Sequence, residues 1–370
     1  MVSTFTGMRN QIYSVISGSG SYLPTRKISN QYFKDHQFFE PDGKRIAKSN
    51  DEIIQKFQAI TGINERRYVT DELVASDIAF FAAQQAIESS GADKETLDYI
   101  IVAHNFGDIR HDNRRSDMVP TLASRVKQRL GIQNSKTVVY DLPFGCAGWL
   151  QGIIQANYFI RSGDAKKVMV IGTDTLSRIC DPHDRDSMIY SDGAGTMILE
   201  SRMSDKPVGI LSHHTETIAN EHTYIINLDK SSNPDYPTDH LFLKMRGRKL
   251  YEQALKLVPQ VIQKSIEKAE LSISSIDKFL IHQANNKMDE AILEQLQLLN
   301  GTHRPAEEIL PMTISFLGNS SVATIPTLYD LMNRGELGHH RIKKDGFLAF
   351  AAVGAGININ SMIYKVPEDH

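Results

Sequence analysis

The chain has 370 residues, of which 41% are hydrophobic, so it can bury one large core or two packed ones. Its 41 Lys and Arg residues nearly balance its 44 Asp and Glu residues, and the formal net charge of -3 gives no indication of a nucleic-acid-binding protein. Two cysteines are too few for a disulfide framework, and neither a secretory signal nor an apolar run of about 18 residues is found, so we expect a cytoplasmic protein that does not enter the membrane.

The first residues predict a short strand and then a polar segment. A β-prone run at residues 13–16 is followed by Gly18 and Gly20, which we interpret as the end of the strand. The stretch GSGSYLP has Leu23 where a dinucleotide-binding fingerprint has its third glycine, so a tight turn is the better interpretation. Residues 25–57 are polar and mixed, and we expect an insertion or cap with short helices.

Strands and helices then alternate. Apolar residues at helical spacing predict a helix over residues 76–89, and apolar runs predict strands at 99–103 and 137–140 on either side of a helix at 122–130. The second of these strands leads into DLPFGCAGWLQG, which contains Cys146. Helical spacing continues from there to residue 163, and another strand follows at 167–171. This succession predicts α/β layers.

The second half of the chain repeats the first. Residues 86–105 align without gaps to residues 265–284. Residues 145–163 resemble residues 318–335, since each stretch has a glycine, a polar or reactive residue and then a helix that ends at a glycine. Two matches in the same order indicate a duplicated α/β fold. We expect one half in residues 1–200, with the insertion near 25–57, and the other in residues 206–370.

The duplication places Cys146 and Asn319 at corresponding helix starts, and His282 at the end of a repeated strand. If a pseudo-twofold axis relates the halves, all three face one site. Backbone N–H groups and the dipole at a helix start favour a thiolate, and a nearby histidine can support such a nucleophile. Each residue alone has an ordinary structural role, as a small buried residue, a satisfied histidine or a helix cap. Their matching positions in the repeat favour a catalytic role for all three residues.

The motifs around these residues resemble those of β-ketoacyl-acyl-carrier-protein synthase III, a condensing enzyme of the thiolase superfamily. The resemblance covers most of the chain after about residue 59. It rests on six stretches: TGINERR (61–67), FGCAGW (144–149), VIGTDTLSRICDPHDR (170–185), YSDGAGTMIL (190–199), IHQANNK (281–287) and LGNSS (317–321). It implies a duplicated, five-layered α-β-α-β-α fold and a homodimer.

The resemblance also implies the roles of the site residues. Cys146 would accept an acyl group from a starter thioester. His282 and Asn319 would donate hydrogen bonds to the carbonyl of a malonyl-type extender during decarboxylative Claisen condensation. The backbone N–H groups of Cys146 and Ala355 would form the oxyanion hole. The activity would be that of an acyltransferase in fatty-acid initiation or a related secondary pathway.

Substrate recognition departs from the family pattern. The stretch of residues 50–63 lacks the tryptophan that stacks on the coenzyme in acetyl-CoA-using members, whereas the arginine opposite is kept as Arg185. Arg248 stands where an asparagine touches the coenzyme arm, and Glu252 replaces a docking lysine. These departures argue against ordinary CoA recognition and make a carrier-bound starter, or a starter other than acetyl, more plausible. The residues that we expect to meet an acidic acyl carrier protein are Lys287, Arg246 and Lys249.

Other functions remain open at this stage. One relative is the ketosynthase of dialkylresorcinol-type or cyclohexanedione-forming pathways, which joins two acyl intermediates. A non-decarboxylating acyltransferase on the same fold and a non-catalytic subunit are further alternatives. We expect no cofactor and no metal, and we interpret Cys180 as structural because it has no partner in the repeat.

Overall fold

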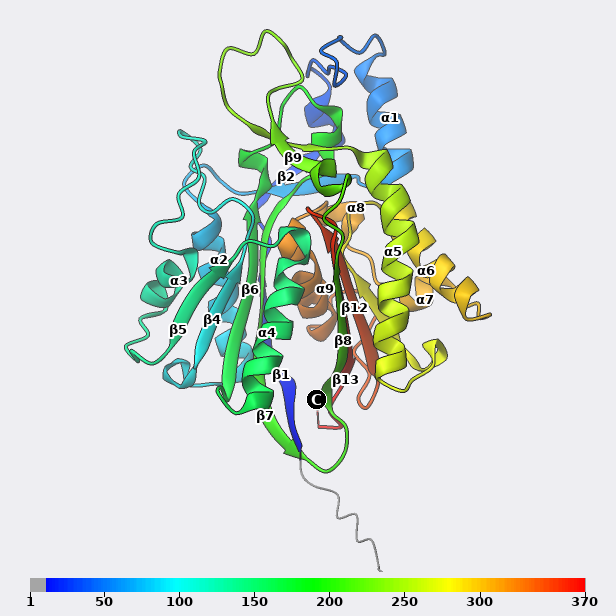
Figure 1. The fold of residues 1–370 in the computed structure, drawn as a ribbon. Coiled ribbons are helices and arrows are strands. Elements are labelled where there is room, and N and C mark those ends of the chain that lie inside the picture. The colour runs from blue at the N-terminus through cyan, green and yellow to red at the C-terminus, as the bar shows by residue number, and fades with distance from the viewer. Residues whose placement is uncertain (1–10, 370) are drawn as a thin grey trace, which may run out of the picture.

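The computed structural model describes residues 11–369, which stack in alternating layers of helices and sheets (Figure 1). Helices α2 (Ala75–Ser90) and α3 (Leu122–Leu130) cover the outer face of one sheet. Helices α4 (Gly148–Ser162) and α9 (Thr324–Asn333) fill the space between this sheet and a second one. Helices α5 (Gly247–Lys268) and α6 (Asn286–Leu299) cover the outside of the second sheet. The five predicted layers are therefore present.

The two sheets share one strand order. The first runs β1-β7-β6-β4-β5, and the second runs β8-β13-β12-β11. In each, two parallel strands are followed by two antiparallel neighbours, so that β4, β6, β7 and β1 correspond to β11, β12, β13 and β8. The strand bounds are β1 (Gln11–Tyr22), β4 (Tyr99–Ala103), β5 (Val138–Leu142), β6 (Lys167–Thr175), β7 (Asp192–Ser204), β8 (Gly209–Thr217), β11 (Lys278–Ile281), β12 (Phe347–Gly354) and β13 (Asn358–Lys365).

The chain passes from the first sheet to the second at residues 205–208, between β7 and β8. The predicted division into residues 1–200 and 206–370 stays a proposal. The strand at 99–103 and the helix at 122–130 have the bounds that the sequence predicted, and the other predicted helices end within two residues of theirs.

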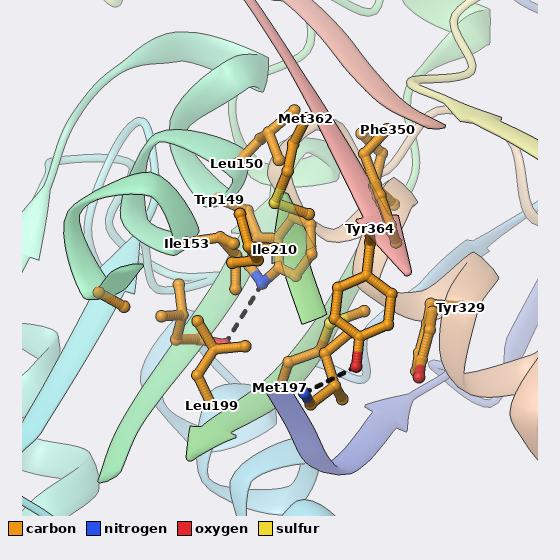
Figure 2. Close-up of a cluster of buried hydrophobic side chains, with 14 of the residues drawn as sticks. Trp149, Leu150, Ile153, Met197, Leu199, Ile210, Tyr329, Phe350, Met362 and Tyr364 are labelled. Carbon is orange, nitrogen blue, oxygen red and sulfur yellow. Dashed lines mark hydrogen bonds between the residues drawn. The ribbon is translucent and has the colours of Figure 1, made fainter. Parts of the chain in front are cut away.

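The largest hydrophobic cluster lies between the sheets (Figure 2). Trp149, at the start of α4, is 1% exposed, and its indole N–H donates to the carbonyl of Val170 at 3.3 Å. Tyr364 reaches across from β13, and its hydroxyl accepts a hydrogen bond from the N–H of Ile16 at 2.9 Å. The two halves therefore share one core, whose labelled members in Figure 2 also include Leu150, Ile153, Met197, Leu199, Ile210, Tyr329, Phe350 and Met362.

The prediction that the first strand ends at Gly18 and Gly20 was wrong, because β1 continues through both glycines to Tyr22. Helix α2 packs directly on the strand there. A Cβ on Gly18 would lie 2.6 Å from the carbonyl oxygen of Ala86, and one on Gly20 would lie 2.4 Å from that of Ala82. The glycines permit a close approach of helix and strand and do not form a turn.

Residues 25–57 contain more than the expected short helices. Strand β2 (Arg26–Ser29) pairs with β3 (Glu65–Tyr68) outside the main sheets, and a helix α1 (Asn50–Thr61) follows a loop. Ser49 caps α1 by accepting from the N–H of Glu52, whose carboxylate accepts from the N–H of Ser49. The remaining elements are β9 (Ile226–Asp229), β10 (Phe242–Met245), α7 (Ala306–Ile309) and α8 (Ile314–Leu317).

Within residues 11–369 no helix combines the length and apolar character needed to cross a membrane.

Candidate active site

The starts of the two central helices meet at a small cavity of about 160 Å³. A one-turn 3-10 helix precedes each of them, at Gly145–Ala147 before α4 and at Ser321–Ala323 before α9. A glycine of positive φ lies at each start: Gly145, at 65°, is the first residue of the first turn, and Gly318, at 66°, lies three residues before the second turn. The cavity is lined mostly by apolar atoms, and its polar lining includes Cys146, His282, Asn319, Ser321 and the backbone of Ala355.

The turn that carries Cys146 packs backbone to backbone against the turn at residues 354–356. A Cβ on Gly145 would lie 2.7 Å from the N atom of Ala355, and one on Gly354 would lie 2.5 Å from the N atom of Cys146. No larger residue fits at either position without moving the other turn. The glycines thus bring the N–H groups of Cys146 and Ala355 close together beside the cavity.

His282 directly follows β11, and its N–H donates to the carbonyl of Ala351 at 2.8 Å. Burial lowers the pKa of its imidazole to about 4, so the ring is neutral near pH 7. Its Nδ1 atom is buried and has no hydrogen-bond partner in the described structure. A neutral imidazole offers one donor and one acceptor to whatever enters the cavity.

Asn319 is held by its backbone and by its own amide. Its N–H donates to the carbonyl of Ile189 at 2.9 Å, and its carbonyl accepts from the N–H of Ser191 at 2.8 Å. The Oδ1 atom accepts from the N–H of Ser321 at 2.8 Å. The amide oxygen is therefore engaged, and the Nδ2 end is the donor that Asn319 can present to the cavity.

Comparisons with known proteins find relatives that align with nearly the whole chain. The family model of 3-oxoacyl-[acyl-carrier-protein] synthase III matches residues 140–218, and the model of its C-terminal part matches residues 266–366. The β-ketoacyl-[acyl-carrier-protein] synthase III of Staphylococcus aureus (strain Newman) is 31% identical over 353 residues, which are 95% of this chain and 98% of the relative. This chain belongs to the synthase III family. It is an acyltransferase of that type with a thiolase-like fold.

Solved structures of the family share the fold. The 3-oxoacyl-[acyl-carrier-protein] synthase III of Aquifex aeolicus VF5 superposes with a TM-score of 0.76 at 24% identity, over 95% of this chain and 99% of that one. The priming β-ketosynthase of the R1128 polyketide pathway has a TM-score of 0.78 at 22% identity, over 99% of both chains. The predicted fold class is confirmed.

The thiol of Cys146 does not have the lowered pKa that we expected from its position at a helix start. Burial raises the pKa of Cys146 to about 11, and the nearby Asp174 carboxyl adds to this rise. A hydrogen bond from Ser321 opposes it. Desolvation by the apolar cavity outweighs the donors at the helix start, so Cys146 is a thiol near pH 7.

This raised pKa predicts slow alkylation of Cys146 at neutral pH. In a Cys180→Ala background, which leaves Cys146 as the one thiol, the rate with iodoacetamide is expected to rise about tenfold per pH unit through pH 9. The urea-unfolded chain is the control and is expected to level off near the ordinary thiol pKa. A folded-state rate that already levels off below pH 8 would show a stabilised thiolate and contradict the prediction.

A larger cavity of about 940 Å³ continues from the small one, since Met245, Leu250, Ala284 and Met288 line both. Arg185 and Arg248, predicted to touch a coenzyme arm, line this second cavity. Its other wall comes from α1 and the loop before it, within the segment 25–57. That segment therefore borders the route that leads to the nucleophile.

Both arginines are engaged by carboxylates in this structure. Arg185 pairs with Glu40 at 3.1 Å, and Glu40 belongs to the segment 25–57. Arg248 is 93% exposed and pairs with Glu252 one turn along α5 at 3.1 Å. The three residues predicted to meet a carrier protein, Arg246, Lys249 and Lys287, are exposed near the starts of α5 and α6. Their role stays a prediction.

Sequence reasoning missed three polar residues next to the thiol, namely Ser321, Asn105 and Asp174. Ser321 lies in the LGNSS motif, so its position was visible but its contact was not. Asn105 lies two residues after the end of the repeated strand β4, and Asp174 is a buried acid inside β6. For Asp174, the signal in the sequence was an acidic residue so close to an apolar run, because a carboxyl buried there needs polar partners.

Proposed function

We propose that the chain loads an acyl group from a starter thioester onto Cys146 and condenses it with a malonyl-acyl-carrier-protein-type extender in a decarboxylative Claisen reaction. The observation that carries this proposal is the convergence of Cys146, His282 and Asn319 from both halves on one apolar cavity. A nucleophile and two uncharged donors beside paired backbone N–H groups fit acyl transfer followed by enolate formation.

In the loading step the Cys146 sulfur attacks the starter's carbonyl carbon. The bond from that carbon to the carrier sulfur breaks, and the thiol proton of Cys146 leaves with the carrier thiol. The oxyanion that forms in between accepts hydrogen bonds from the N–H groups of Cys146 and Ala355, which the packing of the two turns brings close together.

In the condensation step His282 and Asn319 donate to the carbonyl oxygen of the extender thioester. The bond to the extender carboxylate breaks, carbon dioxide leaves, and the electron pair stays as an enolate stabilised by the two donors. The enolate carbon attacks the acyl-cysteine carbonyl and expels the sulfur of Cys146. Donors that are neutral and already oriented, as Asn319 is by Ser321, need no rearrangement when this charge develops.

The starter can be an acyl-CoA or an acyl-carrier thioester, and the structure favours the carrier. A coenzyme that used Arg185 would have to displace Glu40 from it. A carrier-bound arm needs no contact with that arginine, while Arg246, Lys249 and Lys287 offer exposed positive charge to an acidic carrier. The family's homodimer remains a prediction for this chain. Fatty-acid initiation and a resorcinol-type pathway are both compatible with this chemistry.

The proposal is tested by following the mass of the Cys146 peptide. Acyl-CoA and acyl-carrier thioesters of increasing chain length are incubated with the protein, and an acyl adduct is expected on wild type and on Cys180→Ala, but not on Cys146→Ala. Labelled malonyl-carrier is then added, and release of carbon dioxide is expected with product formation. Absence of an adduct at every chain length contradicts the proposal. An adduct without carbon dioxide release indicates the non-decarboxylating alternative.

A further inference from the structure

A chain of short hydrogen bonds links the thiol of Cys146 to a buried carboxyl group. The Ser321 hydroxyl donates to the Cys146 sulfur at 3.3 Å. The Nδ2 of Asn105 donates to the oxygen of that hydroxyl at 2.9 Å and to Oδ2 of Asp174 at 2.6 Å. The backbone N–H of Asn105 donates to the other oxygen of Asp174 at 3.0 Å. Asp174 is 2% exposed, so this contact lies inside the protein.

The chemistry of the groups fixes the direction of every bond in this chain. Both oxygens of Asp174 receive an N–H, which suits an ionised carboxylate because it can only accept. The amide of Asn105 must then turn its Nδ2 toward Asp174, and its second hydrogen meets Ser321. A hydroxyl has a single hydrogen, so with its oxygen occupied by Asn105 that hydrogen is directed to the sulfur.

The surroundings of Asp174 have opposing effects on the pKa of its carboxyl group. Burial raises the pKa of Asp174 above its ordinary value, and the hydrogen bonds from Asn105 and Ser321 together with the nearby ring of His104 limit that rise. Ser321 is within reach of Asp174 as well as of Cys146. The Nδ2 of Asn105 donates both to the carboxylate and to the hydroxyl oxygen of Ser321, and this favours the hydroxyl hydrogen pointing to the sulfur. Without Asn105 the carboxylate would compete more strongly for that hydrogen.

The backbone at Ser321 is held in an uncommon conformation, with φ at +55°. The N–H of Ser321 donates to the Oδ1 of Asn319, so one strained turn orients both the amide of Asn319 and the hydroxyl of Ser321. Non-glycine residues with positive φ persist where the surroundings impose them, often next to a reacting group. This turn thus connects the Cys146 sulfur with the amide of Asn319 through a single residue, Ser321.

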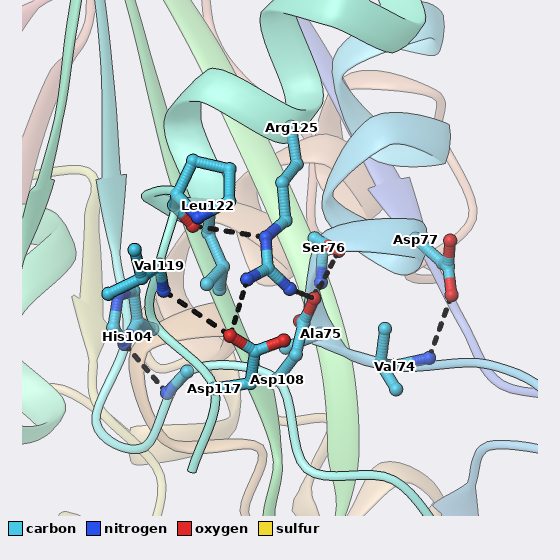
Figure 3. Close-up of polar contacts among 12 residues, drawn as sticks. Val74, Ala75, Ser76, Asp77, His104, Asp108, Asp117, Val119, Leu122 and Arg125 are labelled. Carbon is cyan, nitrogen blue, oxygen red and sulfur yellow. Dashed lines mark hydrogen bonds and ion pairs between the residues drawn. The ribbon is translucent and has the colours of Figure 1, made fainter.

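The loop after Asn105 is braced by a polar cluster (Figure 3). Arg125 pairs with Asp108 at 2.6 Å and with Asp117 at 2.8 Å, and Asp108 also accepts from the N–H and hydroxyl of Ser76. On the other side, the Nδ1 of His104 accepts from a backbone N–H of the same loop at 3.0 Å. Asn105 is therefore positioned by rigid neighbours on both sides of it.

We propose that Ser321 is a catalytic residue, which supplies the hydrogen bond that makes the Cys146 sulfur reactive, and that Asn105 and Asp174 are positioning residues that direct its hydroxyl. This inference rests on the proposed function, because it assigns the three residues to the nucleophile of that reaction. The bond is strongest to a thiolate, so the relay stabilises the sulfur as its proton leaves. It offsets part of the desolvation that the apolar cavity imposes.

The test is the pH profile of Cys146 alkylation by iodoacetamide in the Cys180→Ala background. Ser321→Ala and Ser321→Gly are expected to slow alkylation about tenfold at pH 8 and to move the profile to higher pH, as loss of a hydrogen bond to a charged group does. Glycine suits the positive φ and alanine does not relieve it, so equal effects assign the change to the hydroxyl. Asn105→Ala is expected to shift the profile in the same direction. The matched control is Ser320→Ala, the preceding buried serine, whose profile is expected to stay unchanged.

Each alternative outcome has a defined meaning. Unchanged profiles for both Ser321 variants, in proteins whose near-UV circular dichroism matches wild type, overturn the inference. A shift for Ser321→Ala but none for Asn105→Ala overturns it too, because Ser321 would then act without a relay. Acyl loading of the wild type is measured separately by mass. Failure to load would contradict the proposed function, while the alkylation profiles would still report on the relay.

Discussion

Replacing His282 by alanine is expected to slow decarboxylation of a malonyl-carrier substrate by about 10²–10³-fold. The buried imidazole lies in the cavity beside Asn319, and its loss removes one of two donors for the enolate oxygen. Because that oxygen becomes negative only as carbon dioxide leaves, the loss falls on kcat rather than on binding. Carbon dioxide release under saturating substrate measures the effect.

Two further variants sharpen this result. Asn319→Ala is expected to give a loss of similar size, whereas His213→Ala, which changes a half-buried histidine of β8, is expected to leave the rate unchanged. The endpoint acyl mass on Cys146 is expected to remain in all three proteins, since loading uses the backbone N–H groups. Normal decarboxylation by both cavity variants would remove the assignment of donor roles to His282 and Asn319.

Trp149→Ala is expected to lower the free energy of unfolding by about 3–5 kcal/mol. The indole is 1% exposed and packs in the core shared by both sheets (Figure 2), so its removal leaves a cavity that neither sheet can fill by moving alone. Urea denaturation followed by far-UV circular dichroism measures the change. The loss is expected in the midpoint, with an unchanged slope against urea.

The matched control for this variant lies on the same helix. Tyr158 is 54% exposed, and Tyr158→Ala is expected to change the stability by no more than about 1 kcal/mol. If Trp149→Ala were as mild as Tyr158→Ala, the core would not be the shared structural element that we describe.

The site residues and several element bounds can be predicted from the sequence, because they follow from the internal repeat and from short motifs. The repeat relates Cys146 to Asn319 and places His282 at the end of a repeated strand, and the motifs add Ala355. The structure brings all four residues to one cavity. Local periodicity gives the helix at 122–130 and the strand at 99–103 with their observed bounds. These features depend on residues that are close in sequence or on patterns that occur twice.

What the sequence does not reveal depends on contacts between distant segments. Gly18 and Gly20 have the composition of a turn, and only the packing of α2 explains why the strand continues through them. The pKa of Cys146 follows from the burial of its cavity, which outweighs the local effect of the helix start. Likewise, nothing near Arg185 in the sequence indicates that this residue forms an ion pair with Glu40.

The convergence of two helix starts also determines when the site can form. Ser321 lies 175 residues beyond Cys146, and the turn at Ala355 comes later still. During synthesis the thiol therefore leaves the ribosome well before the groups that make it useful, and contacts of such high sequence separation form late in folding. A half-made chain has the thiol without His282, Asn319 and the turn at Ala355. Catalysed acyl transfer and decarboxylation therefore begin only when the second half is complete.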